Sequence, residues 1–89
     1  MARYMIASPH TEAECLRALD EELGKGKDIL AKFDFGCKEG DHTAYAIVDV
    51  DSRKDALSLI PTFLQNKARI VEVVKVTPEM IKSFHTKAA

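Results

Sequence analysis

The sequence has little charge of one sign, few aromatic side chains and no tryptophan. Its 13 Lys plus Arg residues balance 14 Asp plus Glu, the formal net charge is -1, and aromatic residues make up 7% of the chain. Without a positive surplus, no field attracts a phosphate backbone or an anionic membrane surface. Without aromatic rings among the basic residues, there is no stacking platform for single strands. We therefore expect neither a nucleic-acid nor a membrane partner.

Long apolar runs are also missing. The longest are residues 44–48 and residues 70–71 with 73–74, which Glu72 separates. They fall well short of the roughly 20 residues that span a bilayer, and the first residues offer no apolar signal region of about 7 to 15 residues. The chain has only two cysteines, Cys15 and Cys37. With no secretory signal, free thiols are favoured over a disulfide. These absences predict a cytoplasmic protein.

What is present is enough for one core. The 89 residues, 46% of them hydrophobic, predict a single domain over residues 1–89. A domain of this size buries only about 60 to 65% of the surface of its unfolded chain. Covering a further apolar face by self-association would therefore stabilise it.

Periodicity and capping signals predict six elements and a short tail. Thr11 and Glu14 form a T-x-x-E capping box at a helix start, Ser52 suits a second N-cap, and Pro61 should kink or split that second helix. We expect strands at residues 3–8, 29–37, 43–51 and 68–76, helices at 11–23 and 53–64, and a terminal helix at 79–84. The order βαββαβ predicts a ferredoxin-like α+β fold, with a four-stranded antiparallel sheet in the order 4-1-3-2 and two helices on one face.

The central hairpin has a preferred register. Placing Cys37 opposite His42 pairs Phe35 with Ala44 and puts apolar side chains on one face, whereas a one-residue slip would mix the faces. The predicted core then contains residues from both helices and both hairpin strands: Leu16, Leu19, Phe33, Phe35, Val48, Leu57 and Ile60.

The other sheet face is partly apolar too. Tyr45 and Ile47 point away from the helices in this register, together with part of the last strand. An exposed apolar face of this kind marks an interaction surface. We expect the protein to associate with itself, as a homodimer or higher oligomer.

Several features together resemble a known group of proteins. These are the element order, the T-x-x-E start after Ser8-Pro9-His10, the hairpin at residues 36–43, and the Pro61 segment leading to Ala68-Arg69-Ile70-Val71. They are similar to small ferredoxin-like proteins of the dimeric α/β-barrel superfamily. The resemblance implies pairing through the open sheet faces and a range of chemistry from isomerases and cofactor-free monooxygenases to uncharacterised stress proteins. It carries no catalytic residue over to this chain.

The reactive side chains sort to the two ends of the predicted sheet. We take the first and third strands to run one way and the second and fourth the other, so His10 and Glu14 lie at one end, and Cys37, His42 and His85 at the opposite end. A strand of five or six residues would separate them by roughly 16 to 20 Å. A single site within one protomer is then not expected to combine them.

Three functional hypotheses follow, with the enzyme question and any cofactor left open. The first is a homodimeric module that binds a small molecule on the open sheet face, with Tyr45, Asp49 and His10 as ligand-binding candidates. The second is a cofactor-free enzyme that uses a Tyr45 and Asp49 pocket at the dimer interface. The third is a metal or redox site at Cys37 and His42, with His85 as a further ligand. In that site a protonated imidazole would lower the thiol pKa.

Overall fold

A four-stranded sheet organises the chain. The computed structural model describes residues 1–88, and its strands are β1 (Ala2–Pro9), β2 (Asp34–Phe35), β3 (Thr43–Val50) and β4 (Arg69–Glu72). The order across the sheet is β2-β3-β1-β4, which from the other edge reads 4-1-3-2, and every neighbouring pair is antiparallel. This is an α+β arrangement compatible with a ferredoxin-like fold. It differs in its helices, because several short helices stand where a regular βαββαβ chain has one helix between β1 and β2 and one between β3 and β4.

The expected direction of the strands is wrong. β1 and β3 are antiparallel neighbours, paired from Ala2↔Val50 to Pro9↔Thr43. The physical reason is the hairpin, since β3 must run against β2, and a crossover that skips one strand leaves β1 and β2 parallel. The end of β1 therefore meets the start of β3, at the end of the sheet where the β2–β3 hairpin turns.

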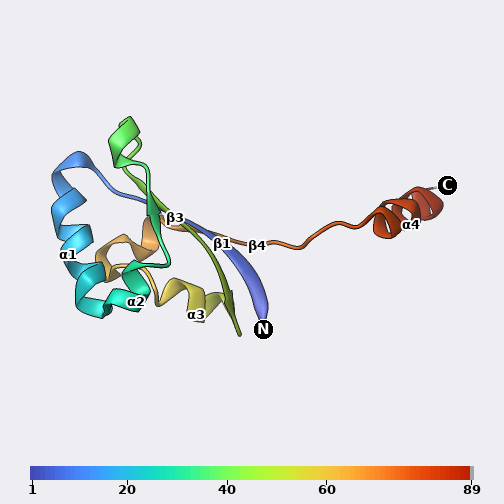
Figure 1. Cartoon of the computed structure of the whole chain (residues 1–89), viewed down its shortest axis with the longest axis horizontal. Coiled ribbons are helices and arrows are strands. Elements are labelled where there is room, and N and C mark those ends of the chain that lie inside the picture. Colours follow the sequence, from blue (N-terminus) through green and yellow to red (C-terminus); the bar gives the residue numbers. More distant parts are fainter. Residues whose placement is uncertain (89) are drawn as a thin grey trace.

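The helices before the last one are short and lie to one side of the sheet, whereas the last helix stands apart (Figure 1). Residues 1–88 contain four α-helices and three 3₁₀ helices: α1 (Cys15–Lys25), α2 (Lys27–Leu30), α3 (Arg53–Leu57), α4 (Pro78–Ala88), η1 (Glu12–Glu14), η2 (Cys37–Glu39) and η3 (Thr62–Lys67). Pro61 separates α3 from η3, so the predicted split is confirmed. Among residues 1–88, none of the helices is long and apolar enough to cross a membrane.

The predicted caps are confirmed. The Thr11 hydroxyl accepts the Glu14 amide at 3.2 Å, while the Glu14 carboxylate accepts the Thr11 amide at 2.9 Å. Ser52 accepts the Asp55 amide at 3.1 Å at the start of α3. These caps satisfy amides that have no partner inside a helix.

The second strand is much shorter than predicted. Residues 29–33 do not pair with β3; they belong to α2 and the turn that follows it, and only the pairs Asp34↔Tyr45 and Phe35↔Ala44 of the expected register are present. Gly26, at φ +124°, ends α1 and lets the chain start α2 immediately. Alternating apolar residues over this short span fit a helical turn as well as a strand.

The core lies between the sheet and the helices. Its buried apolar side chains alternate along the strands and meet α1, α3 and η3: Tyr4, Ile6, Ala18, Phe33, Ala44, Ala46, Val48, Ala56, Ile60, Leu64 and Ile70. Of the predicted core, Phe33, Val48 and Ile60 are buried, and Phe35 and Leu57 are half-buried against them.

The predicted inner face of the first helix is wrong. Leu16 is 70% exposed and Leu23 is 50% exposed, whereas Ala18 and Glu22 are buried. The Glu21 carboxylate accepts the Thr62 amide at 2.9 Å, and the Arg17 guanidinium lies 3.8 Å from the centre of the Phe63 ring. These contacts with η3 fix the rotation of α1 and turn Ala18 and Glu22 inward.

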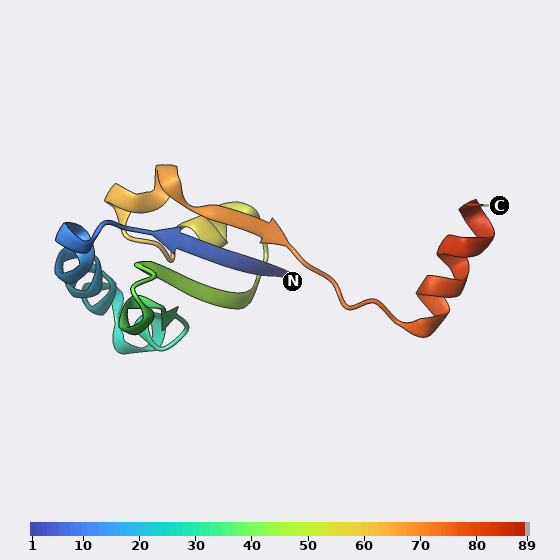
Figure 2. The same cartoon turned by 90° about the horizontal axis from the view of Figure 1, so that it is seen from above.

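The C-terminal helix stands apart from the rest. β4 continues as an extended segment over residues 73–77, and α4 follows at the far end of the molecule (Figure 2). Thr77 caps α4 by accepting the Met80 amide at 3.2 Å, and the helix is longer than the expected residues 79–84. The extents of the whole chain, 52 × 28 × 21 Å, reflect this projecting arm.

Candidate metal centre

Four potential metal ligands lie together at the hairpin end of the sheet. They are His10, Cys15, Cys37 and His42, and one ligand atom from each lies within 4.8 Å of the others. The sequence interpretation placed His10 at the end opposite Cys37 and His42. This expectation is wrong, because antiparallel pairing of β1 and β3 brings the two histidines side by side. Cys15 was not among the predicted site residues.

The two histidines are held by the sheet. His10 directly follows β1, and its amide donates to the His42 carbonyl at 2.8 Å, which extends the β1–β3 ladder by one bond. The imidazole rings stand edge to face with their centres 5.7 Å apart. Nδ1 of His42 is buried and finds no hydrogen-bond partner within residues 1–88.

The two cysteines come from helix starts. Cys15 is the first residue of α1, just after the Thr11 capping box, and Cys37 is the first residue of η2. Their sulfur atoms are 3.6 Å apart, so they are free thiols in contact rather than a disulfide. Cys37 Sγ is also 3.7 Å from Nε2 of His10. The end of β1, the starts of α1 and η2, and the residue just before β3 therefore each supply one side chain.

A tight loop fixes Cys37 and His42. Gly36 donates to the Thr43 carbonyl at 3.0 Å, and its own carbonyl accepts the Asp41 amide at 3.1 Å. A Cβ at Gly36 would lie 2.7 Å from the Asp41 carbonyl oxygen, so only glycine fits without a shift of the backbone. The Asp41 carboxylate accepts the Thr43 hydroxyl at 2.7 Å and the Tyr45 hydroxyl at 2.5 Å. The loop is thus braced on both sides of the ligands.

Burial shifts the pKa of two residues in the cluster, His10 and Cys37. Burial, and then the charge on His42, lower the pKa of His10, so its imidazole is held neutral and able to coordinate. Burial, and then the hydrogen bond and charge of Cys15, raise the pKa of Cys37. The lowering of this thiol pKa that a protonated imidazole would cause is not the net effect in the metal-free cluster. Cys37 is a poor free nucleophile, and a metal ion would have to displace its proton.

Two distances within the cluster are close to those of tetrahedral coordination, and the other pairs of ligand atoms lie within 4.8 Å of one another. With Zn–S bonds of about 2.3 Å and Zn–N bonds of about 2.0 to 2.1 Å, a tetrahedral site places two sulfur atoms about 3.8 Å apart and a sulfur and a nitrogen about 3.6 Å apart. The observed distances are 3.6 Å between sulfurs and 3.7 Å between Cys37 Sγ and His10 Nε2. Two thiolates and two neutral imidazoles would also balance the charge of a divalent ion in this half-buried position.

A mirrored pattern in the sequence could have indicated this group. His10 and Cys15 have four residues between them, and so do Cys37 and His42, which gives H-x4-C followed by C-x4-H. Each pair alone is a weak signal. Together, and next to two strands known to be antiparallel neighbours, they predict one Cys₂His₂ set.

The remaining site candidates do not join the cluster. His85 lies on α4, at the opposite end of the molecule (Figure 1). Tyr45 and Asp49 lie on the sheet face away from the helices, where Tyr45 donates to Asp41 and Asp49 pairs with Arg3 at 3.4 Å. They line separate hollows rather than a common pocket.

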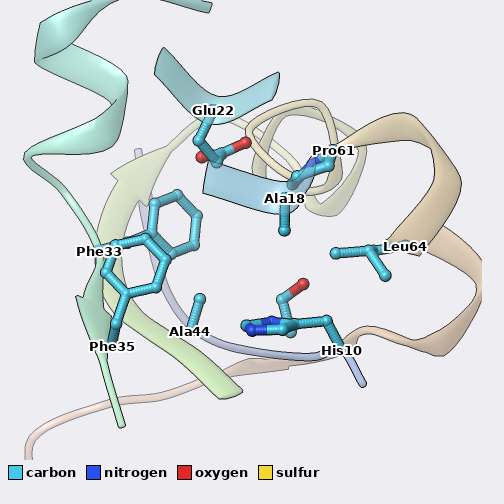
Figure 3. A pocket seen from close by; sticks show the side chains of 9 residues that line it. His10, Ala18, Glu22, Phe33, Phe35, Ala44, Pro61 and Leu64 are labelled. Carbon is cyan, nitrogen blue, oxygen red and sulfur yellow. The ribbon is translucent and has the colours of Figure 1, made fainter. Parts of the chain in front are cut away.

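A cavity with polar side chains adjoins the cluster, and His10 belongs to both. Glu22 of α1, Ser8 of β1 and His10 line a cavity that Phe33 and Phe35 close from the side (Figure 3). Glu22 and Ser8 are each only 2% exposed, and both carboxylate oxygens and the hydroxyl lack a hydrogen-bond partner within residues 1–88. Burial raises the pKa of Glu22 to about 7, with Lys25 opposing the shift and Glu21 adding to it.

Comparison with known proteins adds no family assignment, since no protein family, curated protein or solved structure matches the chain significantly. The site must therefore be interpreted from its own geometry.

Proposed function

We propose that this protein is a metal-binding domain that holds one Zn²⁺ ion, or a metal ion of similar softness, through His10, Cys15, Cys37 and His42. The observation that carries the proposal is the convergence of these four side chains, from four separate points of the fold, to within 4.8 Å. Two thiolates with two imidazoles are a preferred ligand set of structural zinc. A closed set of four leaves no open position for substrate, so a structural or regulatory role is favoured over metal catalysis.

The other functional hypotheses have weaker support. Sulfur atoms 3.6 Å apart could form a disulfide, but the raised pKa of Cys37 disfavours fast thiol exchange. For a Tyr45 and Asp49 enzyme, the Asp49 side chain is 58% exposed and already paired with Arg3. A small molecule bound on the open sheet face, and the dimeric α/β-barrel likeness that motivates it, stay secondary proposals. A reducing cytoplasm, which keeps both thiols available, is the proposed location.

Zinc binding can be measured with the full chain. Reduced, metal-free protein is titrated with Zn²⁺ against a chromogenic chelator, and Co²⁺ serves as a second probe because its absorption reports tetrahedral thiolate coordination. We expect one ion per chain. Cys37→Ser and His42→Ala should each weaken Zn²⁺ binding by at least about 100-fold, since loss of a ligand exceeds the 10- to 100-fold effect typical of a ligand's hydrogen-bond partner.

His85 supplies the matched control. It is the one histidine outside the cluster among the three in the sequence, so His85→Ala should bind Zn²⁺ as the unchanged protein does. Equal affinity in His85→Ala, His42→Ala and Cys37→Ser would refute the site. So would Co²⁺ spectra without a thiolate-to-metal band.

A further inference from the structure

Within the described part of the chain, residues 1–88, two apolar surfaces have no partner. The first is the open sheet face, which we define by Met5, Tyr45, Ile47, Val71 and Val73. It lies opposite the helices because its side chains alternate with the buried ones along the strands. Ile47 is 65% exposed at its centre, and hollows of about 220 and 470 Å³ lie on either side of Met5 and Ile47.

The second surface is the apolar stripe of α4. Met80, Ile81 and Phe84 have helical spacing and share one side of the helix. Ile81 is 46% and Phe84 52% exposed. A helix of 11 residues is marginal in water unless its apolar side packs against something. The helix stands clear of its own sheet in both views (Figures 1 and 2).

We propose that α4 of one copy packs on the open sheet face of a second copy, and that the second copy returns the same contact. Each chain carries both the helix and the face, so one reciprocal exchange covers all four surfaces and closes a two-fold dimer. The exchange does not depend on metal binding.

The connector favours a second copy over the helix's own sheet. It spans residues 73–77, reaches roughly 16 Å when extended, and contains no glycine at which the chain could reverse cheaply. Its last residue is Thr77, and the following Pro78 disfavours helical backbone angles at Thr77 and favours extended ones. Val73 continues the ladder by donating to the Arg3 carbonyl at 2.9 Å, so the arm leaves along the strand direction.

Charges at the two surfaces are compatible with this contact. Lys32 and Asp34 border the larger hollow of the open sheet face. Glu79 and Lys82 flank the apolar stripe of α4. Both surfaces thus have an apolar centre and charges of both signs at the edge, the usual arrangement of a protein interface.

The test is the mass of the full chain in solution at micromolar concentration, measured by light scattering. The unchanged protein should have twice the 9.9 kDa chain mass. Phe84→Asp, on the helix, and Ile47→Asp, on the face, should each reduce the mass to that of one chain. Leu23→Asp places the same charge at a 50% exposed leucine of α1 and should leave the dimer intact.

Two results would overturn the proposal. A monomeric unchanged protein would mean that α4 docks on its own sheet or on nothing. A dimer that Ile47→Asp separates but Phe84→Asp does not would mean that the sheets pair directly, without the helix. Circular dichroism of each variant checks that the fold is kept, and the two substitutions lie on different elements, so misfolding of one leaves the other informative.

Discussion

Glu22 should make the protein less stable as the pH rises through the slightly acidic range. In the folded chain its carboxyl is buried without a hydrogen-bond partner within residues 1–88, and its pKa is raised from 4.5 to about 7. Below pH 4.5 both the folded and unfolded chains hold the proton. Between 4.5 and about 7 the unfolded chain releases it while the folded chain keeps it, so unfolding is favoured increasingly.

The size of the effect follows from the two pKa values. One pKa unit corresponds to 1.36 kcal/mol, so a rise from 4.5 to about 7 costs about 3 kcal/mol of folding free energy above neutral pH. A domain of this size has only about 5 to 10 kcal/mol in total. His10, which lines the same cavity, contributes no compensating positive charge near pH 7, because its own pKa is lowered.

The substitution Glu22→Gln removes this titration while keeping nearly the same shape. Urea unfolding at pH 4 and pH 8 should show the variant close to the unchanged protein at the lower pH and about 3 kcal/mol more stable at the higher one. Taking the difference between the two proteins cancels the titration of other groups. Glu12→Gln, at an exposed position of η1, is the control. A difference that is the same at both pH values would refute the reasoning.

Further outcomes are expected from the core, the loop and the thiols. Phe33→Ala should lower the free energy of unfolding by about 3 to 5 kcal/mol in urea titration, because Phe33 is only 6% exposed; an unchanged midpoint would contradict its place in the core. Gly36→Ala should cost about 1 to 3 kcal/mol and weaken Zn²⁺ binding, since its Cβ would meet the Asp41 carbonyl oxygen at 2.7 Å, whereas Gly24→Ala, with open space in α1, should stabilise by about 0.5 to 1 kcal/mol. Cys37 should react slowly with a thiol reagent at neutral pH because its pKa is raised, and more slowly still with Zn²⁺ present; equal rates with and without Zn²⁺ would argue against coordination.

The sequence was informative where local chemistry decides the structure. The capping box at Thr11 and Glu14, the N-cap at Ser52 and the break at Pro61 all depend on neighbours within a few residues, and all are confirmed. The pairing of Phe35 with Ala44 is also confirmed. Only one register of the hairpin places its apolar side chains on the same face.

The predictions were wrong where contacts between distant parts of the chain determine the structure. Leucine spacing favoured an inner face of α1 containing Leu16, but contacts of Arg17 and Glu21 with η3 turn that residue outward. The cluster of His10 with Cys37 was missed for a different reason. It required the direction of β1 relative to β3, which follows from the topology and was taken the wrong way.

The mirrored pairs of ligands have a consequence for how the chain folds. His10 with Cys15 and Cys37 with His42 are local pairs, and the two cysteines are 22 residues apart along the sequence. An ion that engages both pairs before the sheet forms would close that loop in advance, as a cross-link does. For a disulfide, closing a loop of this length removes about 3 kcal/mol of chain entropy from the unfolded state. A bound metal ion would act similarly but reversibly, so the concentration of available metal would change the rate at which β1 and β3 pair during folding.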